Sequence, residues 1–346
     1  MQAIPDQELL KRFLATAGAL AHLKTNGSHR RKTYENDFRI GDQFVDDSSV
    51  ILSSKASRRM GGKNQVASSH HTPHIRNRAT HVNEVVAHSI RITEHLGLNI
   101  HLTQAIALGH DIGHVPFGHQ GENYLQKKWN PKFTHEVFGV VIAQHIERKG
   151  RGLNLTHATL DGMWRHSGKN TSETMTQEAW VVRYADKIAY LFADYNDFKR
   201  LEWRCSSELE KVMAWFGGYQ RDRTFRTIMA LCEESAKAGR VHFETSEPAL
   251  MFNKLRGLMY AEYERVVEQN VARFLDPIYD FINRSELIPP WLGIALLTDE
   301  EVSRLIDDPH MLNSRVLMDT GLGEIIRNTD REHLFAINGI ELDLNW

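Results

Sequence analysis

Apolar residues recur at the spacing of α-helices along most of the chain. The pattern is clearest from Thr80 to Leu96, and Gly97 follows it as a stop signal. Asn99 is a suitable N-cap for a second helix that runs towards Leu108. Further helical patterns cover residues 121–127, 134–147, 160–165, 177–201 and 250–274. The sequence therefore predicts an all-α fold.

Turn and strand signals are fewer. Residues 113–121 contain Pro116 and three glycines, which indicates a turn-rich connection. Residues 149–173 are rich in Gly and Thr and are expected to form loops around the short helix at 160–165. Prolines at 277, 289 and 290 should interrupt the later helices. The best strand signals are 241–243 and the tail 335–344, where Asn338-Gly339 favours a hairpin turn.

Composition is that of a globular protein with a sizeable core. The chain has 346 residues, of which 41% are hydrophobic and 25% charged, and its formal net charge is −2. Cys205 and Cys232 are its only cysteines, too few for a disulfide scaffold or a cysteine-rich metal site. The first twenty residues lack the layout of a signal peptide and a membrane-length apolar run. We therefore expect a cytoplasmic protein with no membrane partner.

Local charge is more informative than net charge. Residues 48–83 contain no Asp or Glu. The same segment holds the basic residues Lys55, Arg58, Arg59, Lys63, Arg76 and Arg78, and the histidines His70, His71 and His74. An acid-free basic segment suits a polyanionic ligand such as a polyphosphate. A solvated basic loop is the alternative interpretation.

An adjacent His-Asp pair is the strongest chemical signal in the chain. His110 and Asp111 place an imidazole nitrogen and a carboxylate side by side. Together with His81 upstream and Asp186 downstream, they would supply four mixed nitrogen and oxygen ligands to one divalent metal. Such a set suits Mn, Mg, Fe, Co, Ni or Zn, and Mn or Mg is favoured here. This pattern predicts a metal-dependent phosphohydrolase.

A second polar group follows immediately. His114, His119 and Glu122 lie within nine residues, and His135 comes one helix later. His119 and Glu122 are three residues apart at a predicted helix start, so we expect a hydrogen bond between them. A carboxylate that holds an imidazole fixes its tautomer and raises its basicity, as general acid–base catalysis requires.

The predicted helix 177–201 carries one polar face. Asp186, Tyr190, Asp194 and Asp197 follow helical spacing, and Arg183 lies one turn earlier. A face of this kind either points to solvent or forms a wall that contacts a polar ligand. Beside the predicted metal ligand Asp186, the second interpretation is favoured.

Short motifs follow one another in a long ordered series between residues 46 and 200. They are Ser54–Arg59, Lys63–Val66, Arg76–His81, Ala105–His119, Gly152–Thr156, Arg165–Lys169, Ala185–Tyr190 and Asp194–Asp197. In this order they resemble the deoxynucleoside triphosphate triphosphohydrolases of the HD superfamily, above all the short bacterial deoxyguanosine triphosphate triphosphohydrolases. The chain departs from the family's usual pattern at Ser57, Ala79 and Glu136, so the preferred base stays open.

The resemblance implies a fold and a reaction. The fold is a single all-α domain over residues 1–346, with a helical HD core at about 46–200 and a helical C-terminal extension at about 201–346. The reaction is water attack on the α-phosphorus of a dNTP, dGTP being the favoured guess, which releases deoxynucleoside and inorganic triphosphate. The metal would lower the pKa of its bound water.

The resemblance also assigns roles to individual residues. His81, His110, Asp111 and Asp186 match metal ligands, and His114, His119, Glu122 and His135 match the catalytic group. Gln65, Arg78, Lys187, Tyr190 and Asp194 match positions that hold sugar and phosphates. His119 would protonate the leaving 5′ oxygen, Tyr190 would exclude a 2′-hydroxyl, and Asp194 would accept from the 3′-hydroxyl. Whether His114 or His135 shares the role of His119 stays open.

The resemblance adds expected partners, and two other functions compete with it. Relatives are often ring-like oligomers, commonly hexamers, so we expect a homo-oligomer, a hexamer being favoured. An activating nucleotide is a further expectation. A nucleoside monophosphatase or phosphodiesterase on an HD core is the first competing function. The second is a regulator that binds nucleotide or single-stranded nucleic acid, with residues 48–83 as its groove. Triphosphate as product would distinguish the favoured function from both.

Overall fold

The computed structural model of the protein describes residues 7–30, 41–66, 74–168, 170–266, 270–306, 312–342 and 344. Over these residues the chain is helical and contains two isolated bridges, Arg30–Thr156 and Asn64–Asn77, but no sheet. The predicted all-α class is therefore confirmed. His70, His71 and Lys169, named above, lie outside the described residues.

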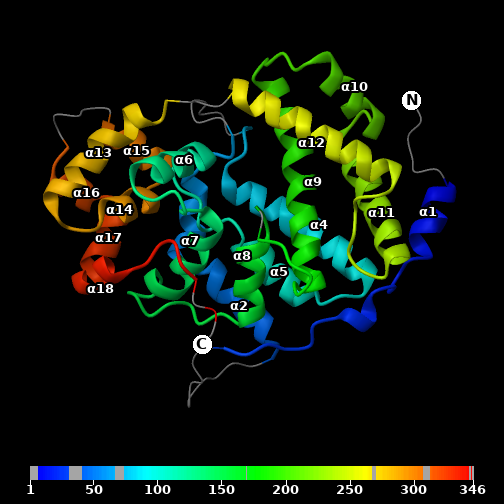
Figure 1. Ribbon diagram of the computed structural model, residues 1–346, viewed down its shortest axis with the longest axis horizontal. Coiled ribbons are helices and arrows are strands. Elements are labelled where there is room, and N and C mark those ends of the chain that lie inside the picture. The colour runs from blue at the N-terminus through cyan, green and yellow to red at the C-terminus, as the bar shows by residue number, and fades with distance from the viewer. Residues whose placement is uncertain are drawn as a thin grey trace.

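Three helices form the centre of the molecule (Figure 1). α4 (Arg78–Leu96) packs against both α5 (Ile100–Gly109) and α9 (Gln177–Arg200). Each begins at a polar cap: Asn77, Asn99 and Thr176 accept hydrogen bonds from the first-turn backbone N–H groups. α4 ends at Gly97, whose φ of +80° closes the helix in the left-handed region. The periodic pattern and its cap signals predicted these helices closely.

Shorter helices surround this centre. α2 (Gln43–Leu52) packs on α5, and α8 (His157–Arg165) contacts α5, α7 and α9. α6 (Gly118–Lys128) and α7 (His135–Val141) follow the turn-rich connection, and a π-helical turn at Ile142–Ile146 extends α7. The remaining N-terminal elements are α1 (Gln7–Leu14), α3 (Lys55–Arg59), and 3₁₀ turns at Ala21–Leu23 and Met60–Gly62.

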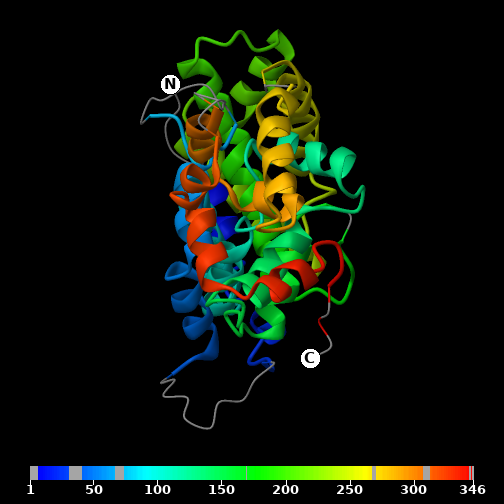
Figure 2. The same cartoon turned by 90° about the vertical axis from the view of Figure 1, so that its left-hand side faces the viewer.

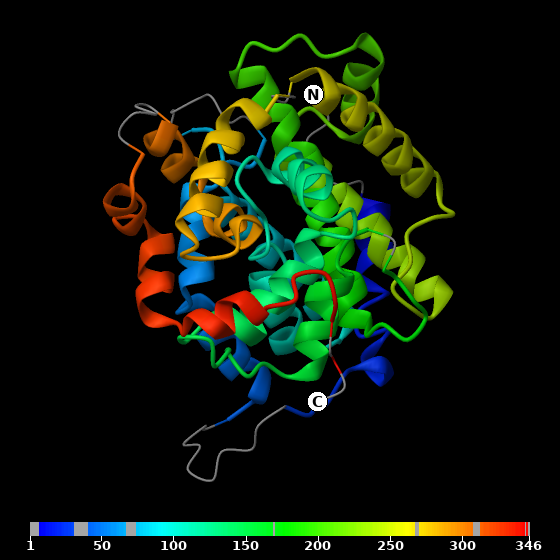
Figure 3. The ribbon, with the colours of Figure 1, turned by 60° about the vertical axis from the view of Figure 1, so that its left-hand side comes forward.

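The part of the chain after residue 200 packs on two different sides of the centre (Figures 2 and 3). α10 (Ser207–Phe216), α11 (Gln220–Ala238) and α12 (Glu247–Val266) share one hydrophobic core with α4, α5 and α9. The second core joins α6, α7 and α8 to the segment from α13 to α18, which we call the C-terminal lobe. Its helices are α13 (Ala272–Ser285), α14 (Pro290–Leu296), α15 (Asp299–Ile306), α16 (Ser314–Met318), α17 (Gly321–Asn328) and α18 (Arg331–Ala336).

Two expectations for this region are wrong. Pro277 does not end a helix but lies inside α13, where it is the sixth residue. Its missing N–H leaves only the carbonyl of Arg273 without a helical partner, near an end where backbone groups are incompletely paired in any case. The strands expected at 241–243 and 335–344 are absent from the described residues, and α18 covers the start of the second. Pro289 and Pro290, by contrast, do mark an interruption, because α13 ends at Ser285 and Pro290 is the first residue of α14.

A helix that crosses a lipid bilayer needs about 20 mostly apolar residues. Within the described ranges, no helix is both long and apolar enough to cross a membrane.

Candidate functional site

A cavity of about 830 Å³ lies between the central helices and the segments that follow them. Its walls come from α4, α6, α7, α9, α12 and the loop that precedes α6. Every predicted site residue except His110 lines it: Gln65, Arg78, His81, Asp111, His114, His119, Glu122, His135, Asp186, Lys187, Tyr190 and Asp194. The fold therefore brings separate stretches of sequence to one place.

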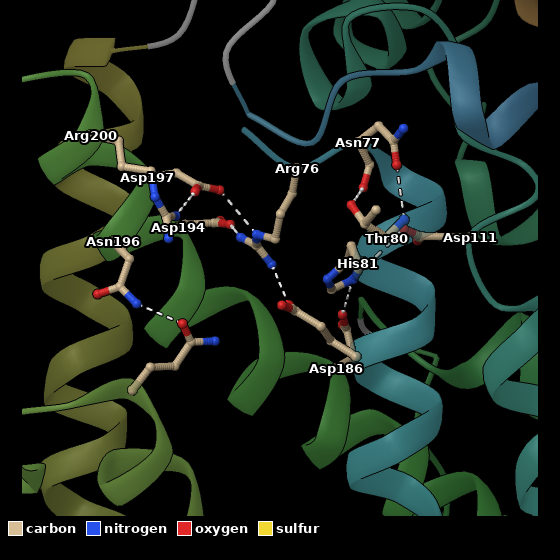
Figure 4. A network of polar contacts seen from close by, with 12 residues as sticks. Arg76, Asn77, Thr80, His81, Asp111, Asp186, Asp194, Asn196, Asp197 and Arg200 are labelled. Carbon is tan, nitrogen blue, oxygen red and sulfur yellow. Dashed lines mark hydrogen bonds and ion pairs between the residues drawn. The ribbon is translucent and has the colours of Figure 1, made fainter. Parts of the chain in front are cut away.

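The four predicted metal ligands lie close together, and His81, Asp111 and Asp186 among them line the cavity. His81 Nε2 is 3.0 Å from Asp186 Oδ1, and Figure 4 shows the two side chains pointing towards each other from α4 and α9. His110 donates from Nδ1 to the carbonyl of Ala107 at 2.7 Å, which directs its Nε2 towards the carboxylates. That Nε2 lies 3.5 Å from Asp111 Oδ1 and 3.9 Å from Asp186 Oδ1.

The donor set fits a divalent cation. His110 Nε2 is buried and has no hydrogen-bond partner, although an unsatisfied buried polar atom is costly. Burial alone would raise the pKa of Asp111, but His110, His114 and Arg78 outweigh it and hold that pKa well below its ordinary value. A buried imidazole nitrogen without a partner, beside carboxylates whose pKa values are held low, suits a metal ion. Mixed nitrogen and oxygen ligands do not by themselves select one metal.

Arg78 lies closer to the ligands than the resemblance implied. Its guanidinium is buried and donates to Asp111 Oδ2 at 2.9 Å, so it holds a predicted ligand in place while it lines the cavity. The absence of a side chain at Gly118 makes room for the Arg78 guanidinium, because a Cβ on residue 118 would lie 2.7 Å from Arg78 Nη2.

Three histidines form a stacked cluster beside the ligands. The rings of His114 and His135 lie face to face with centroids 3.8 Å apart, and His119 stands edge-on at 5.2 Å and 5.5 Å from them. His114 Nε2 is 3.2 Å from Asp111 Oδ1, which links the cluster to the metal ligands. His114 and His135 are buried, whereas His119 is exposed. His119 is therefore the most exposed of the three histidines that line the cavity.

The expectation that Glu122 forms a hydrogen bond with His119 is wrong. Its Oε2 accepts from His135 Nδ1 at 2.7 Å and from the His135 backbone N–H at 3.3 Å, rather than from His119. Spacing along one helix made His119 an available partner, but α7 brings His135 onto the same carboxylate. Burial alone would lower the pKa of His135, yet Glu136 and Glu122 outweigh it and raise the pKa to about 9.

Sequence reasoning assigned no role to His166, although its motif contributed to the family resemblance. His166 is buried and donates from Nδ1 to the carbonyl of Met163 at 2.7 Å. Its ring centroid lies 5.0 Å from that of His110 and 5.4 Å from that of His135. Burial, with His110 and His135, lowers the pKa of His166 to about 4. The cavity therefore holds one more neutral imidazole than expected.

Most of the polar face predicted on α9 lines the cavity, and α12 contributes to the same lining. Asp197 is the exception and does not line it. Burial, together with Arg183 and Arg256, lowers the pKa of Lys187 to about 7. α12 contributes the lining residues Asn253, Arg256, Gly257, Tyr260, Tyr263 and Glu264. These residues recur at helical spacing within the predicted helix 250–274. That spacing is the one sequence signal from which they could have been predicted.

Asp194 is engaged in a buried network (Figure 4). Its Oδ2 accepts from the Tyr263 hydroxyl at 2.6 Å, and its Oδ1 pairs with Arg76. Arg76 also donates to Asp197 at 3.0 Å and to Glu84 at 2.8 Å. Tyr190 and Gln65 complete this side of the cavity, and Gln65 Oε1 is buried without a hydrogen-bond partner.

The basic segment 48–83 is not one continuous surface for an anion. Of its described lysines and arginines, only Arg78 lines the cavity. The others pair elsewhere: Lys55 with Glu324, Arg59 with Glu147, Arg76 with three acids, and Lys63 with the carbonyl of His114, while Arg58 donates to the carbonyl of Ser53. The remaining positive charge at the cavity comes from Arg183, Lys187 and Arg256.

The His-Asp segment packs backbone to backbone against α7. A Cβ on Gly113 would lie 2.0 Å from the carbonyl oxygen of His135 and 2.3 Å from the Gly139 nitrogen. We expect Gly113→Ala to lower the free energy of unfolding by about 3 kcal/mol or more, because backbone atoms must move to make room. Urea unfolding measures this, with Gly218→Ala as control, since no atom lies within 4 Å of a Cβ there. Equal stability of the two variants would contradict the close approach.

Known proteins are similar in sequence to this chain. The family model for the HD domain matches residues 78–191. A deoxyguanosinetriphosphate triphosphohydrolase-like protein of Clostridium tetani is 35% identical over 259 residues, which cover 72% of this chain and 73% of the relative. One from Clostridium perfringens is 34% identical and covers 70% of each chain. One from Caldanaerobacter subterraneus is 41% identical over 174 residues, 50% of this chain and 51% of the relative.

Proposed function

Because the chain belongs to the family of deoxyguanosinetriphosphate triphosphohydrolase-like proteins with an HD domain, we propose that it hydrolyses dNTPs to deoxynucleoside and inorganic triphosphate. dGTP is the favoured substrate. One observation carries the proposal: an unpaired, buried His110 Nε2 and ionised carboxylates lie at one cavity with an exposed histidine and several cationic side chains. A polyphosphate ester is the ligand that uses all of these groups.

His81, His110, Asp111 and Asp186 would hold the divalent cation, for which Mn or Mg is favoured. Such a cation lowers the pKa of coordinated water and offsets charge on a phosphate oxygen. Arg78, which donates to Asp111, keeps that carboxylate oriented towards the site. The tether from His110 Nδ1 to the carbonyl of Ala107 keeps the opposite ring nitrogen free as a ligand.

The phosphate tail would lie along α9 and α12. Arg183, Lys187 and Arg256 line the cavity. Burial is the main cause that lowers the pKa of Lys187, and the positive charges of Arg183 and Arg256 come next. The three cationic side chains therefore lie close to one another. A bound polyanion relieves that repulsion and forms charge-assisted hydrogen bonds to these groups. This positive cluster supports a substrate with a longer phosphate chain than a monophosphate has.

The leaving 5′ oxygen needs a proton, and His119 is proposed to deliver it. All three histidines line the cavity, but His119 is exposed, whereas His114 and His135 are buried. Glu122 fixes His135, whose ring packs on His114, so the two buried imidazoles hold the orientation of His119. Loss of general acid catalysis of this kind costs a factor of about 10² to 10⁴ in rate.

Tyr190 and Asp194 are proposed to contact the sugar. A ring at Tyr190 would leave no room for a 2′-hydroxyl. Asp194 already accepts from Tyr263 and pairs with Arg76. A carboxylate offers about four lone-pair directions, so Asp194 can still accept from a 3′-hydroxyl.

Replacement of Lys187 by methionine tests the phosphate assignment. We expect Lys187→Met to raise KM for the dNTP by about 10- to 100-fold, since a hydrogen bond to a charged group contributes about 1.5–3 kcal/mol. Steady-state kinetics measures this effect. Lys254→Met is the matched control, because Lys254 pairs with Glu208 on the surface. An unchanged KM in Lys187→Met would remove this residue from the phosphate site.

Product analysis tests the reaction itself. The purified protein is incubated with Mn²⁺ and each dNTP or NTP in turn, and products are separated by ion-exchange chromatography. Deoxynucleoside with intact triphosphate, lost in His110→Ala, is the expected result. Monophosphate or pyrophosphate would indicate another HD phosphohydrolase. Absence of turnover together with salt-dependent binding of single-stranded DNA would indicate a binding protein instead.

A further inference from the structure

One carboxylate reaches the cavity from the C-terminal lobe. Asp299 lies at the start of α15, and its side chain is 4% exposed. Its Oδ1 accepts from the Phe117 backbone N–H at 2.8 Å, and its Oδ2 accepts from the Asn64 N–H at 3.0 Å. One side chain thus joins two loops that lie 182 and 235 residues away in the sequence.

Asp299 is not needed as the cap of its own helix. Thr298 Oγ1 accepts from the Glu301 N–H at 3.1 Å, and Glu301 Oε2 accepts from the Thr298 N–H at 2.9 Å. This reciprocal pair is a capping box, and it satisfies the helix start without Asp299. Both oxygens of Asp299 are therefore free to serve the two loops.

The loop that Asp299 holds connects two of the clustered histidines. Residues 115–118 run from His114 to His119, and within them Phe117 has φ +61° and Gly118 φ +54°. A left-handed conformation in a residue other than glycine is strained and persists only where its surroundings hold it. The hydrogen bond from the Phe117 N–H to Asp299 helps to hold this strained residue in place.

A second tether holds the same loop from the other end. Lys63 is buried and donates from Nζ to the carbonyl of His114. Lys63 precedes Asn64, whose N–H is bound by Asp299. The two tethers therefore belong to one unit, in which the 63–64 segment is fixed by the C-terminal lobe and in turn fixes the histidine loop.

We propose that Asp299 is a positioning residue that fixes the path of the loop between His114 and His119. The C-terminal lobe then forms part of the catalytic apparatus, although the HD family match ends at residue 191. The kinetic consequence rests on the proposed function: misplacement of a catalytic group by about 1 Å can cost on the order of 10²-fold in rate. The structural consequence, a loosened loop, does not depend on that function.

Hydrogen–deuterium exchange of the full-length Asp299→Asn variant tests the structural part. Asparagine keeps the shape but turns one acceptor into an NH₂ group, which faces a backbone N–H. We expect faster exchange in peptides that cover residues 62–66 and 111–121, with other peptides unchanged. Glu300→Gln is the control, because Glu300 lies next to Asp299 in α15 but is exposed. Unchanged exchange in Asp299→Asn, or uniform faster exchange throughout, would overturn the proposal.

Steady-state kinetics on the same two variants tests the functional part. Asp299→Asn should lower kcat about 10- to 100-fold and change KM less than kcat, because Arg183, Lys187 and Arg256 lie on helices that Asp299 does not hold. Glu300→Gln should keep wild-type kcat. Equal losses in both variants, or a wild-type kcat in Asp299→Asn, would refute a positioning role. If the wild-type protein hydrolyses no dNTP, the proposed function fails, while the exchange result still decides whether Asp299 holds the loop.

Discussion

Replacement of His110 by alanine should abolish binding of the divalent cation and nearly all turnover. His110 Nδ1 is committed to the carbonyl of Ala107, and its buried Nε2 has no other partner. A metal-assisted reaction that loses its metal loses several kcal/mol of transition-state stabilisation, which corresponds to on the order of 10³-fold or more in rate. Metal content by mass spectrometry, measured beside turnover, tests this expectation.

His101→Ala is the matched control for that experiment. His101 lies on α5, the helix that leads to His110, but it is exposed and lies outside the cavity lining. It should keep both metal and activity. Full metal content and wild-type turnover in His110→Ala would remove His110 from the metal site.

Replacement of His119 by alanine should have the second largest effect and leave the metal bound. His119 is the exposed member of the histidine cluster, and none of the proposed ligands depends on it for a hydrogen bond. We expect kcat to fall by about 10² to 10⁴, the usual contribution of a general acid. Turnover at saturating dGTP and metal content, measured on one preparation, separate this loss from loss of the cation.

Two results would contradict the assignment to His119. Unchanged turnover would show that another group donates the proton. In that case His135→Ala should carry the loss, because His135 is the histidine that Glu122 holds. Loss of metal in His119→Ala would instead show that this side chain supports the ligand set.

The helices could be predicted from the sequence because their signals are local. Apolar periodicity located α4, α5 and α9, and Asn99 marked the start of α5 as expected. The expected tail hairpin failed although its turn signal is real. Asn338 Oδ1 accepts from the Ile340 N–H at 3.1 Å, but Gly339 packs against Trp291 instead of starting a second strand. A turn motif specifies a bend, whereas tertiary contacts decide whether a strand continues after it.

The same division between local and distant information applies to the site. The His-Asp pair and its neighbours could be found because they lie in compact motifs. The pairing of Glu122 with His135 could not be predicted from the sequence. His119, three positions away, and His135, on the next helix, were both available partners for this carboxylate. Arg256 and Asp299 carry no local motif, and only the packing of α12 and α15 brings them to the cavity.

Hydrolysis of dGTP in H₂¹⁸O tests the central claim most directly. Water attack on the α-phosphorus breaks the bond between that phosphorus and the 5′ oxygen. Mass spectrometry of the products should therefore find one ¹⁸O atom in the inorganic triphosphate and none in the deoxyguanosine. Label in the deoxyguanosine would indicate attack at the 5′ carbon. Label in a monophosphate or pyrophosphate, with no intact triphosphate formed, would contradict the account.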